Sequence, residues 1–187
     1  MEQRQPIRRI AVLGSSGAGK STLAVLLGEV TGLPVVHLDR EHWQPGWTEP
    51  DKAVWTARLT ELATRPAWII DGQYGAALTD RLNRADLAIF LDLPTRVCLW
   101  RIVERWRRLR GRVRPDMGEG CPEKIDLEFV HYVATFRRLQ RPTVIAALRA
   151  SGVRTAWIAT RAEQVAFADA LKTSGLAAAA ADAARWR

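Results

Sequence analysis

Short apolar runs alternate along the chain with segments whose apolar residues follow a helical spacing. Most of these runs are continuous rather than alternating, which is typical of strands buried on both faces of a parallel sheet. They occupy residues 10–13, 35–38, 68–70, 87–91 and 153–158. The pattern therefore predicts an α/β fold with parallel strands.

Residues 21–30, between the first two runs, carry leucine and valine at helical spacing, and Gly32 follows, as at many helix ends. Strand, helix and strand form a βαβ unit with a right-handed crossover. Further helices are predicted at residues 51–64, 95–109, 122–139, 142–150 and 161–171. The Ala-rich residues 173–187 are expected to form a frayed helix or a disordered tail. Because no linker or repeat is recognised, residues 1–187 are predicted to form a single domain.

The composition is that of a globular protein. Apolar residues make up 48% of the 187 positions, but no apolar run approaches the roughly 18–20 residues that span a bilayer. The first residues carry charges without the apolar segment of a secretory signal. Neither Cys98 nor Cys121 belongs to a CxxC motif or a Cys/His cluster, so we expect a cytoplasmic protein with reduced, structural thiols and no membrane partner.

Basic residues outnumber acidic ones and gather in one segment. The net charge is +8, which favours anionic partners such as nucleotides, nucleic acids or acidic membranes. Residues 96–114 hold eight arginines and a single acid. The spacing predicts that Arg101, Arg105, Arg108 and Arg112 line one face of a helix. This face could contact phosphates, or it could be an ordinary solvated helix surface.

The most specific motif is GSSGAGKS at residues 14–21, which matches the Walker A pattern G-x-x-x-x-G-K-[S/T] of P-loop NTPases. It falls between a buried strand and a helix, as the motif requires. Backbone N–H groups of such a loop and the helix N-terminus bind the phosphates of a nucleoside triphosphate, and side chains would block this approach. The predicted nucleotide-binding residues are Gly14, Ser15, Gly17, Ala18, Gly19, Lys20, Ser21 and Thr22.

Lysine is rare in this chain, because only four of the 28 basic residues are lysines. A lysine at position 20 can reach the β- and γ-phosphates within the loop, whereas the planar fork of an arginine would crowd the same space. Ser21 would offer its hydroxyl to Mg²⁺, and Thr22 would cap the helix or contact the α-phosphate. The motif therefore predicts ATP and Mg²⁺ as ligands and Lys20 as a catalytic residue.

A second carboxylate near Mg²⁺ is normal in P-loop NTPases and follows an apolar strand. Asp39, Asp71 and Asp92 each follow an apolar run, and the carboxyl ends of parallel strands face the ligand crevice. We take Asp71 as the preferred magnesium-side carboxylate. A strand-end aspartate that only caps the next turn is the alternative for Asp71 and for Asp92.

Several motifs together resemble the adenylate-kinase-related proteins labelled DNA topology modulation proteins. They are GSSGAGKST, HLDREHWQPGW, WIIDGQYG, IFLDLP and RGRVRPDMGEGCPEK, within residues 7–150. The resemblance implies a P-loop, nucleoside-monophosphate-kinase-like core with five parallel strands flanked by helices. It also implies a substrate-binding insertion at about 39–66 and a lid at about 108–122. The label implies DNA, although nothing in these residues shows a role in DNA topology.

Residue roles also follow from this resemblance. Arg108 and Arg112 match the R-x-x-G-R pattern at which adenylate kinases begin their lid, and they inherit contacts to the ATP base and phosphates. Mobile cations of this kind suit the charge that develops on a transferring phosphoryl group. Such kinases supply further arginines after the lid, where this chain has Arg137, Arg138 and Arg141.

The acceptor side departs from adenylate kinases. Their D-G-F-P-R segment reads Asp71-Gly-Gln-Tyr here, with no arginine before Arg81, which argues against an AMP-like acceptor. Asp39 resembles the aspartate of small-molecule and nucleoside P-loop kinases that accepts the proton of the attacking hydroxyl or supports Mg²⁺. Arg40 could bind an acidic acceptor or simply lie on the surface.

The remaining aromatic and histidine residues leave alternatives open. Trp43 and Trp47 could stack on a base or sugar, or they could pack in the core. His37 and His42 show no partner pattern for a metal site or a catalytic triad, and His37 is expected to face packing.

The leading hypothesis is an ATP-dependent phosphotransferase that moves the γ-phosphoryl group of Mg·ATP to a nucleotide, a nucleoside or another small acceptor. The alternative is a DNA-associated ATP-binding protein that uses its arginines on the phosphate backbone; nucleic acid is a possible partner but not the favoured one. ATP hydrolysis coupled to a partner is less favoured, because no water-positioning residue or arginine finger can be recognised.

Overall fold

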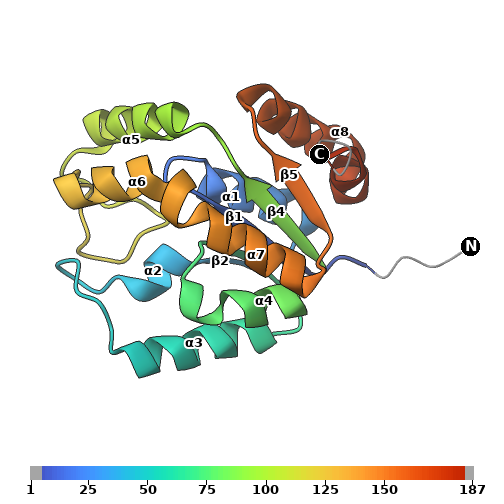
Figure 1. Cartoon of the computed structure of the whole chain (residues 1–187), viewed down its shortest axis with the longest axis horizontal. Helices are drawn as coiled ribbons and strands as arrows, with labels where there is room; N and C mark the ends of the chain where they lie inside the picture. Colours follow the sequence, from blue (N-terminus) through green and yellow to red (C-terminus); the bar gives the residue numbers. More distant parts are fainter. Residues whose placement is uncertain (1–5, 184–187) are drawn as a thin grey trace, which may run out of the picture.

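The computed structural model, which describes residues 6–183, has a single parallel sheet between two layers of helices (Figure 1). The strand order is β2-β3-β1-β4-β5, and every neighbouring pair is parallel. The strands are β1 (Arg9–Gly14), β2 (Val35–His37), β3 (Trp68–Asp71), β4 (Leu87–Leu91) and β5 (Thr155–Ile158). The predicted α/β fold with five parallel strands is confirmed.

The helices follow the strands in the order expected for βαβ units. They are α1 (Lys20–Thr31), α2 (Leu38–His42), α3 (Lys52–Thr64), α4 (Leu78–Arg84), α5 (Thr95–Leu109), α6 (Leu127–Leu139), α7 (Arg141–Ser151) and α8 (Arg161–Ala183), with a short 3₁₀ turn η1 (Gly75–Ala77) before α4. Among the described residues, none of these helices is both long and apolar enough to cross a membrane.

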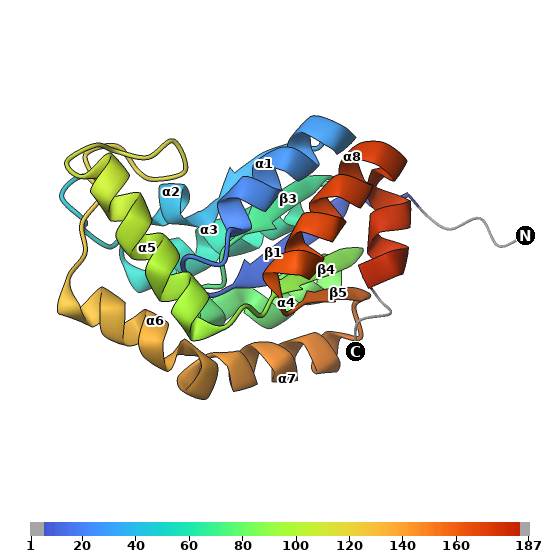
Figure 2. The ribbon, with the colours of Figure 1, turned by 90° about the horizontal axis from the view of Figure 1, so that it is seen from above.

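Alternate residues of the central strand β1 point into two separate hydrophobic cores. Ile10 and Val12 pack on one face against α1, α8 and parts of α5 and α6. Ala11 and Leu13 pack on the other face against α3, α4 and α7. Figure 2 shows the sheet from above, with α1 and α8 on one side and α7 on the other. Since both faces of the sheet are covered, its strands are continuously apolar, as the sequence pattern indicates.

A loop that we call the lid occupies residues 110–126 and changes one predicted helix boundary. Helix α5 ends at Leu109, as predicted, and Gly111 adopts a left-handed φ of 75°. Arg112 therefore lies beyond the helix and does not continue its arginine face, contrary to the prediction. Helix α6 begins at Leu127 rather than at residue 122, after the N-cap Asp126 accepts a hydrogen bond from the backbone N–H of Phe129.

The Ala-rich end is more ordered than predicted over the residues that the structure describes. Helix α8 continues to Ala183, with a break at Gly175, whose φ is 77°. Ala179 and Ala180 are each only 1% exposed and pack into the core against α1. Small side chains allow this close packing, so residues 176–180 contribute to the fold. Residues 184–187 of the expected tail lie outside the described part of the chain.

Candidate functional site

A cavity of about 1630 Å³ opens at the carboxyl ends of the strands. It lies between the phosphate loop (residues 14–19), the insertion (residues 39–66) and the lid (residues 110–126). This volume exceeds the range of roughly 300–1,000 Å³ that is typical of ligand pockets, so it has room for a nucleoside triphosphate together with a second small molecule. The position is the one expected for ligands in open parallel sheets.

The phosphate loop needs its glycines because of both backbone conformation and space. Gly14, Gly17 and Gly19 all have positive φ values, of 146°, 80° and 96°. A Cβ atom at Gly14 would lie 2.6 Å from the carbonyl oxygen of Leu91, and one at Gly17 would lie 2.5 Å from that of Cys98. Larger residues would therefore displace the loop from β4 and α5, which hold it under the cavity.

Two side chains hold the loop from the outside. The carbonyl oxygen of Ala18 accepts hydrogen bonds from Arg101 Nη1 at 3.1 Å and from Gln164 Nε2 at 2.9 Å. Arg101 Nη2 also donates to Gln164 Oε1 at 2.9 Å. Arg101, the first residue of the predicted arginine face of α5, thus positions the phosphate loop. Its partner Gln164 belongs to α8 and was not predicted from the sequence.

The loop residues divide into those that face the cavity and those behind it. Ser15 and Ala18, both predicted nucleotide contacts, are buried and do not line the cavity, whereas Ser16, which was not predicted, does. Lys20 lines the cavity and donates from Nζ to the Ser15 carbonyl oxygen at 3.1 Å. The other predicted residues that face the cavity are Gly14, Gly17, Gly19, Ser21 and Thr22.

The strand-end carboxylates have three different environments. Asp71 is 4% exposed and lies behind His37, whose Nδ1 is 2.9 Å from Asp71 Oδ1. Burial alone would lower the pKa of His37, but the hydrogen bond and the charge of Asp71 more than offset it and raise the pKa above its usual value. His37 itself lines the cavity, so the expectation that it only faces packing is wrong.

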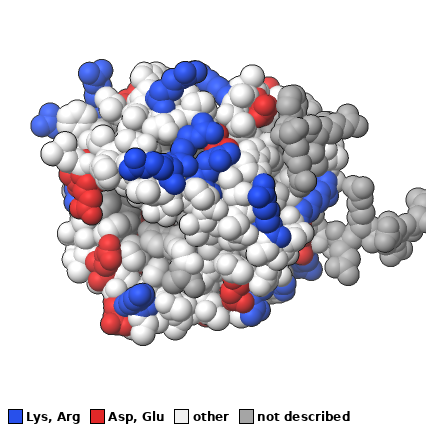
Figure 3. Space-filling model, viewed as in Figure 1, with Lys and Arg blue, Asp and Glu red and all other residues white. Residues whose placement is uncertain are grey.

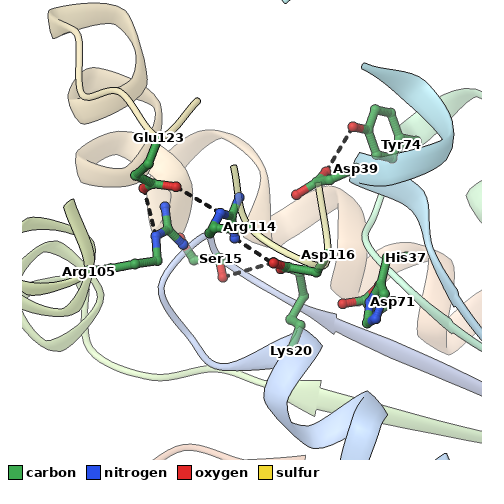
Figure 4. Close-up of polar contacts among 10 residues, drawn as sticks. All are labelled: Ser15, Lys20, His37, Asp39, Asp71, Tyr74, Arg105, Arg114, Asp116 and Glu123. Carbon is green, nitrogen blue, oxygen red and sulfur yellow. Dashed lines mark hydrogen bonds and ion pairs between the residues drawn. The ribbon is translucent and has the colours of Figure 1, made fainter. Parts of the chain in front are cut away.

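Asp39 reaches the cavity from α2 and pairs with a tyrosine. Tyr74 donates its hydroxyl to Asp39 Oδ1 at 2.9 Å, and both residues line the cavity (Figure 4). Burial raises the pKa of Tyr74, and the Asp39 charge raises it further. Tyr74 therefore stays a neutral donor that orients the carboxylate.

Asp92, by contrast, is a structural anchor away from the cavity. Its carboxylate accepts hydrogen bonds from Arg141 Nε and Nη2 at 2.7–3.0 Å and from Trp157 Nε1 at 3.2 Å. Arg137 Nη2 lies 3.7 Å from the same carboxylate. Arg137 and Arg141 therefore stabilise the α6–α7 junction, and none of Arg137, Arg138 and Arg141 lines the cavity.

The lid carries a chain of ion pairs across the phosphate loop (Figure 4). Glu123 pairs with Arg105 Nε at 2.8 Å and with Arg114 Nε at 2.7 Å, and Arg114 Nη1 pairs with Asp116 at 2.9 Å. Burial would raise the pKa of Asp116, but the Arg114 charge and the Ser21 hydroxyl lower it below its usual value. Asp116 is therefore a carboxylate beside the hydroxyl that was predicted to meet Mg²⁺.

The lid also docks directly on the insertion. Gly46 N–H donates to the Gly120 carbonyl oxygen at 3.1 Å, and Cys121 Sγ donates to the Gln44 carbonyl oxygen at 3.1 Å. A Cβ atom on Gly118 would collide with the carbonyl oxygen of Trp43. The cavity is thus covered by a lid that rests on the insertion.

The predicted cationic residues differ in where they point. Arg108 is exposed and lines the cavity, whereas Arg112 and Arg40 are exposed and do not line it. Sequence reasoning placed Arg105 only on the arginine face and missed Arg114. Both line the cavity. The acidic residue Glu123, which pairs with both arginines, is the signal in the sequence that could have indicated them.

Arg81 is fully buried instead of facing the acceptor side. It is 2% exposed, and its Nη2 donates to the carbonyl oxygens of Gly72 at 2.6 Å and Gln73 at 2.8 Å. Burial lowers its pKa to about 10, which still leaves it charged at neutral pH. Arg81 thus holds the turn after β3 in place through these two hydrogen bonds to its backbone.

The side chains of this site could bind Mg²⁺ only together with phosphate oxygens of a bound nucleotide. In the part of the chain that the structure describes, no group of three or more His, Cys, Asp or Glu side chains could hold a metal ion by itself. Mg²⁺ commonly takes one or two protein oxygens and completes its shell with waters and substrate phosphates. The Ser21 hydroxyl, which faces the cavity beside Asp116, is suited to this type of site, with Asp71 behind His37.

Comparison with known proteins gives a fold and no family. No family model matches the sequence, and no curated protein matches it. A solved shikimate kinase from Acinetobacter baumannii, in complex with shikimate, matches with a TM-score of 0.52 and 19% sequence identity over 83% of each chain. A shikimate kinase from Aquifex aeolicus has a TM-score of 0.47 at 17% identity, covering 90% of this chain and 99% of that one. A gluconokinase from Sinorhizobium meliloti has a TM-score of 0.45 at 19% identity, covering 80% and 94%.

The first of these matches shows that the chain shares its α/β fold with a shikimate kinase, in agreement with the sheet order. The closer resemblance to adenylate kinases stays a prediction from the sequence. Nothing in these comparisons supports the DNA topology modulation label.

Proposed function

We propose that this protein is an ATP-dependent phosphotransferase that transfers the γ-phosphoryl group of Mg·ATP to a hydroxyl group of a small molecule. The observation that carries the proposal is that Lys20 of the phosphate loop and Asp39 of the insertion line the same covered cavity. The Lys20 ammonium group is suited to contact the phosphate that is transferred, and the Asp39 carboxylate is suited to accept the proton of an attacking hydroxyl.

The phosphate side would be held mainly by the backbone of residues 14–19 and the N-terminus of α1. Lys20 would contact the β- and γ-phosphates, and Arg108 of α5 would add positive charge beside them. Ser21 would hold Mg²⁺, which would supply neutralisation of the charge on the phosphates; Asp71 does not line the cavity and would act on the site only through His37. Arg105 and Arg114 line the same cavity, but their charges are balanced by the paired carboxylates of Glu123 and Asp116.

In the transfer step, the acceptor oxygen bonds to the γ-phosphorus while the bond to the oxygen bridging the β- and γ-phosphates breaks. The proton of the acceptor hydroxyl passes to the Asp39 carboxylate, and ADP leaves. Tyr74 would keep Asp39 oriented through its 2.9 Å hydrogen bond. A phosphate acceptor is already anionic and would not need this base, so the Asp39–Tyr74 pair supports a hydroxyl acceptor. Arg40 and Trp43 remain the other proposed acceptor-side residues.

The test is coupled ADP release with a panel of nucleosides, nucleoside monophosphates, polyols and sugar acids. Asp39→Asn should lower kcat by about 100-fold or more, the usual contribution of a general base, while ATP affinity is retained. Asp169→Asn, an exposed aspartate of α8 outside the cavity, is the matched control. Unchanged turnover in Asp39→Asn would exclude the hydroxyl-acceptor mechanism.

Binding to duplex DNA tests the alternative function, which is that of a DNA-associated ATP-binding protein. A DNA-associated protein should lose duplex affinity steeply with salt and should keep it when Mg·ATP fills the cavity. Specific duplex binding that is indifferent to millimolar Mg·ATP would favour the alternative over the kinase.

A further inference from the structure

The two ends of the cavity differ in their chemistry. The end formed by the phosphate loop, α5 and the lid has a mixed lining of five bases, Lys20, Arg101, Arg105, Arg108 and Arg114, and three acids, Glu104, Asp116 and Glu123. The end formed by the insertion, the turn after β3 and α6 carries two acids and four aromatic rings, which are Asp39, Glu49, Trp43, Trp47, Tyr74 and Tyr132. We call this second end the acceptor pocket.

The same two acids act on several groups around the acceptor pocket. Burial raises the pKa of Tyr74, and both Asp39 and Glu49 raise it further. Burial raises the pKa of Tyr132 to about 12, with Asp39 adding to the effect. Burial lowers the pKa of His42, against the opposing charges of Glu49 and Asp39. The two carboxylates therefore act together on the groups around this pocket.

Of three cations near this pocket, two do not line it and the third, Lys124, does. Arg40 is exposed and does not line the cavity, and Arg81 is buried behind the turn with its Nη2 on two backbone carbonyls. Lys124 does line the cavity, but its Nζ lies 3.5 Å from Asp126. In Figure 3, acidic and basic side chains both lie along the edge beside the lid and the insertion, and further basic side chains gather nearer the middle of that face.

The aromatic rings of the pocket favour a positive charge as well. Trp43 and Trp47 form an edge-to-face pair with centroids 5.4 Å apart. Lys124 Nζ lies 4.9 Å from the centre of the Trp47 ring, which shows that this ring already accepts an ammonium group. Aromatic faces next to carboxylates are a typical recognition site for ammonium ligands.

We propose that the phosphoryl acceptor is a hydroxyl compound that carries an ammonium group and no carboxylate or phosphate, as an amino sugar or amino alcohol does. The inference rests on the proposed kinase function for the transfer itself. In this arrangement Asp39 accepts the hydroxyl proton, while Glu49 and the Trp43 ring bind the ammonium group. A sugar acid or a nucleoside monophosphate would bring a second negative charge next to Asp39 and Glu49, and the pocket would disfavour it.

Binding is tested first, because it does not depend on turnover. Tetramethylammonium chloride is titrated into the protein with Mg²⁺ and a non-hydrolysable ATP analogue, and tryptophan fluorescence is recorded. We expect saturable quenching, with Kd raised at least fivefold in Trp43→Leu and in Glu49→Gln. The exposed lid residue Glu119, which does not line the cavity, gives the control Glu119→Gln, in which Kd should be unchanged. Glu49 is exposed, so its variant should keep the fold if Trp43→Leu does not.

No quenching by tetramethylammonium, equal affinity in Glu49→Gln, or tighter binding of acetate in its place would overturn the inference. The second arm compares ADP release with glucosamine, glucose and glucuronate, which are pyranose sugars of positive, zero and negative charge. Turnover at least tenfold faster with glucosamine than with glucuronate supports the inference, and the reverse order overturns it while leaving the kinase function standing. Specific tetramethylammonium binding without transfer to any hydroxyl compound would instead remove the kinase function and keep the pocket.

Discussion

His37 and Asp71 lie in register on the neighbouring strands β2 and β3, with His37 Nδ1 2.9 Å from Asp71 Oδ1. The Asp71 bond and charge raise the pKa of His37 despite the opposing effect of burial. A histidine whose pKa is raised on folding stabilises the fold fully below its unfolded pKa of 6.5, and this contribution is lost as the pH rises through the higher folded value. Wild type should therefore lose free energy of unfolding as the pH rises from 6.5 through this folded pKa.

The variant His37→Asn tests this relationship, because an amide can still donate to Asp71 but does not titrate. Urea unfolding of wild type and variant at several pH values should give a stability difference that shrinks with rising pH. The exposed histidine of α6 provides the control His131→Asn, which should follow wild type. A difference that is constant across this range would mean that the pair does not titrate on unfolding.

Lys20→Arg tests whether the loop needs a compact cation. Lys20 Nζ stays within the loop at 3.1 Å from the Ser15 carbonyl oxygen, where a planar guanidinium lacks space. We expect phosphoryl transfer to fall by about 100-fold or more while the unfolding midpoint changes little. Coupled ADP release measures the first, and thermal unfolding measures the second. Lys52→Arg on the exposed start of α3 should have wild-type turnover; wild-type turnover in Lys20→Arg would contradict the assigned role.

Arg141→Ala should damage the fold and spare the nucleotide site. Asp92 is buried, and removing Arg141 leaves its carboxylate without its closest ion pair. Breaking a buried pair from one side costs about 3 kcal/mol or more, so the free energy of unfolding should drop by that order. Arg138→Ala, on an exposed position, should change it by no more than about 0.5 kcal/mol. A loss of ATP affinity in a folded Arg141→Ala protein would instead place this arginine at the phosphates.

The sequence predicts those parts of the fold that depend on neighbouring residues. The phosphate loop joins a strand directly to a helix, and the positive φ values of its glycines are a local requirement. Continuous apolar runs correctly indicate strands covered on both faces. These features are encoded locally, so a pattern along the chain is sufficient to predict them.

Long-range pairs could not be predicted in the same way. Gln164 meets Ala18 across 146 positions, and Arg141 meets Asp92 across 49. The side chain of an arginine on α5 can point to the loop, the lid or solvent, and only the packing of α8 and the lid decides among these. His37 likewise looked unpartnered, because its partner Asp71 lies on another strand.

Gly118→Ala should lift the lid from the insertion. The added Cβ atom would collide with the Trp43 carbonyl oxygen, which belongs to the backbone and cannot rotate away. Cys121 is 1% exposed and donates a hydrogen bond to the Gln44 carbonyl oxygen. In the variant it should react with a thiol reagent about tenfold faster, because the free energy of opening the lid locally should fall by about 1.4 kcal/mol. Mass spectrometry of the labelled protein separates Cys121 from the buried Cys98.

Gly75→Ala is the matched control for this experiment, because no other atom lies within 4 Å of the Cβ position. Its labelling rate should equal that of wild type. Equal rates in Gly118→Ala and wild type would show that the lid does not depend on this contact.

Asp116→Asn should weaken the dependence of ATP binding on magnesium. The Asp116 carboxylate lies beside the Ser21 hydroxyl, and Arg114 holds it there at 2.9 Å. Metal-free ATP brings its full triphosphate charge next to this carboxylate, whereas Mg²⁺ between them reduces the repulsion. We expect the variant to bind ATP about tenfold more tightly than wild type in EDTA, and with nearly unchanged affinity in excess Mg²⁺, as measured by calorimetry. Glu119→Gln removes one lid charge outside the cavity and should leave both affinities unchanged. An equal gain with and without magnesium would show that Asp116 acts only through net charge and not through its place at the phosphate loop.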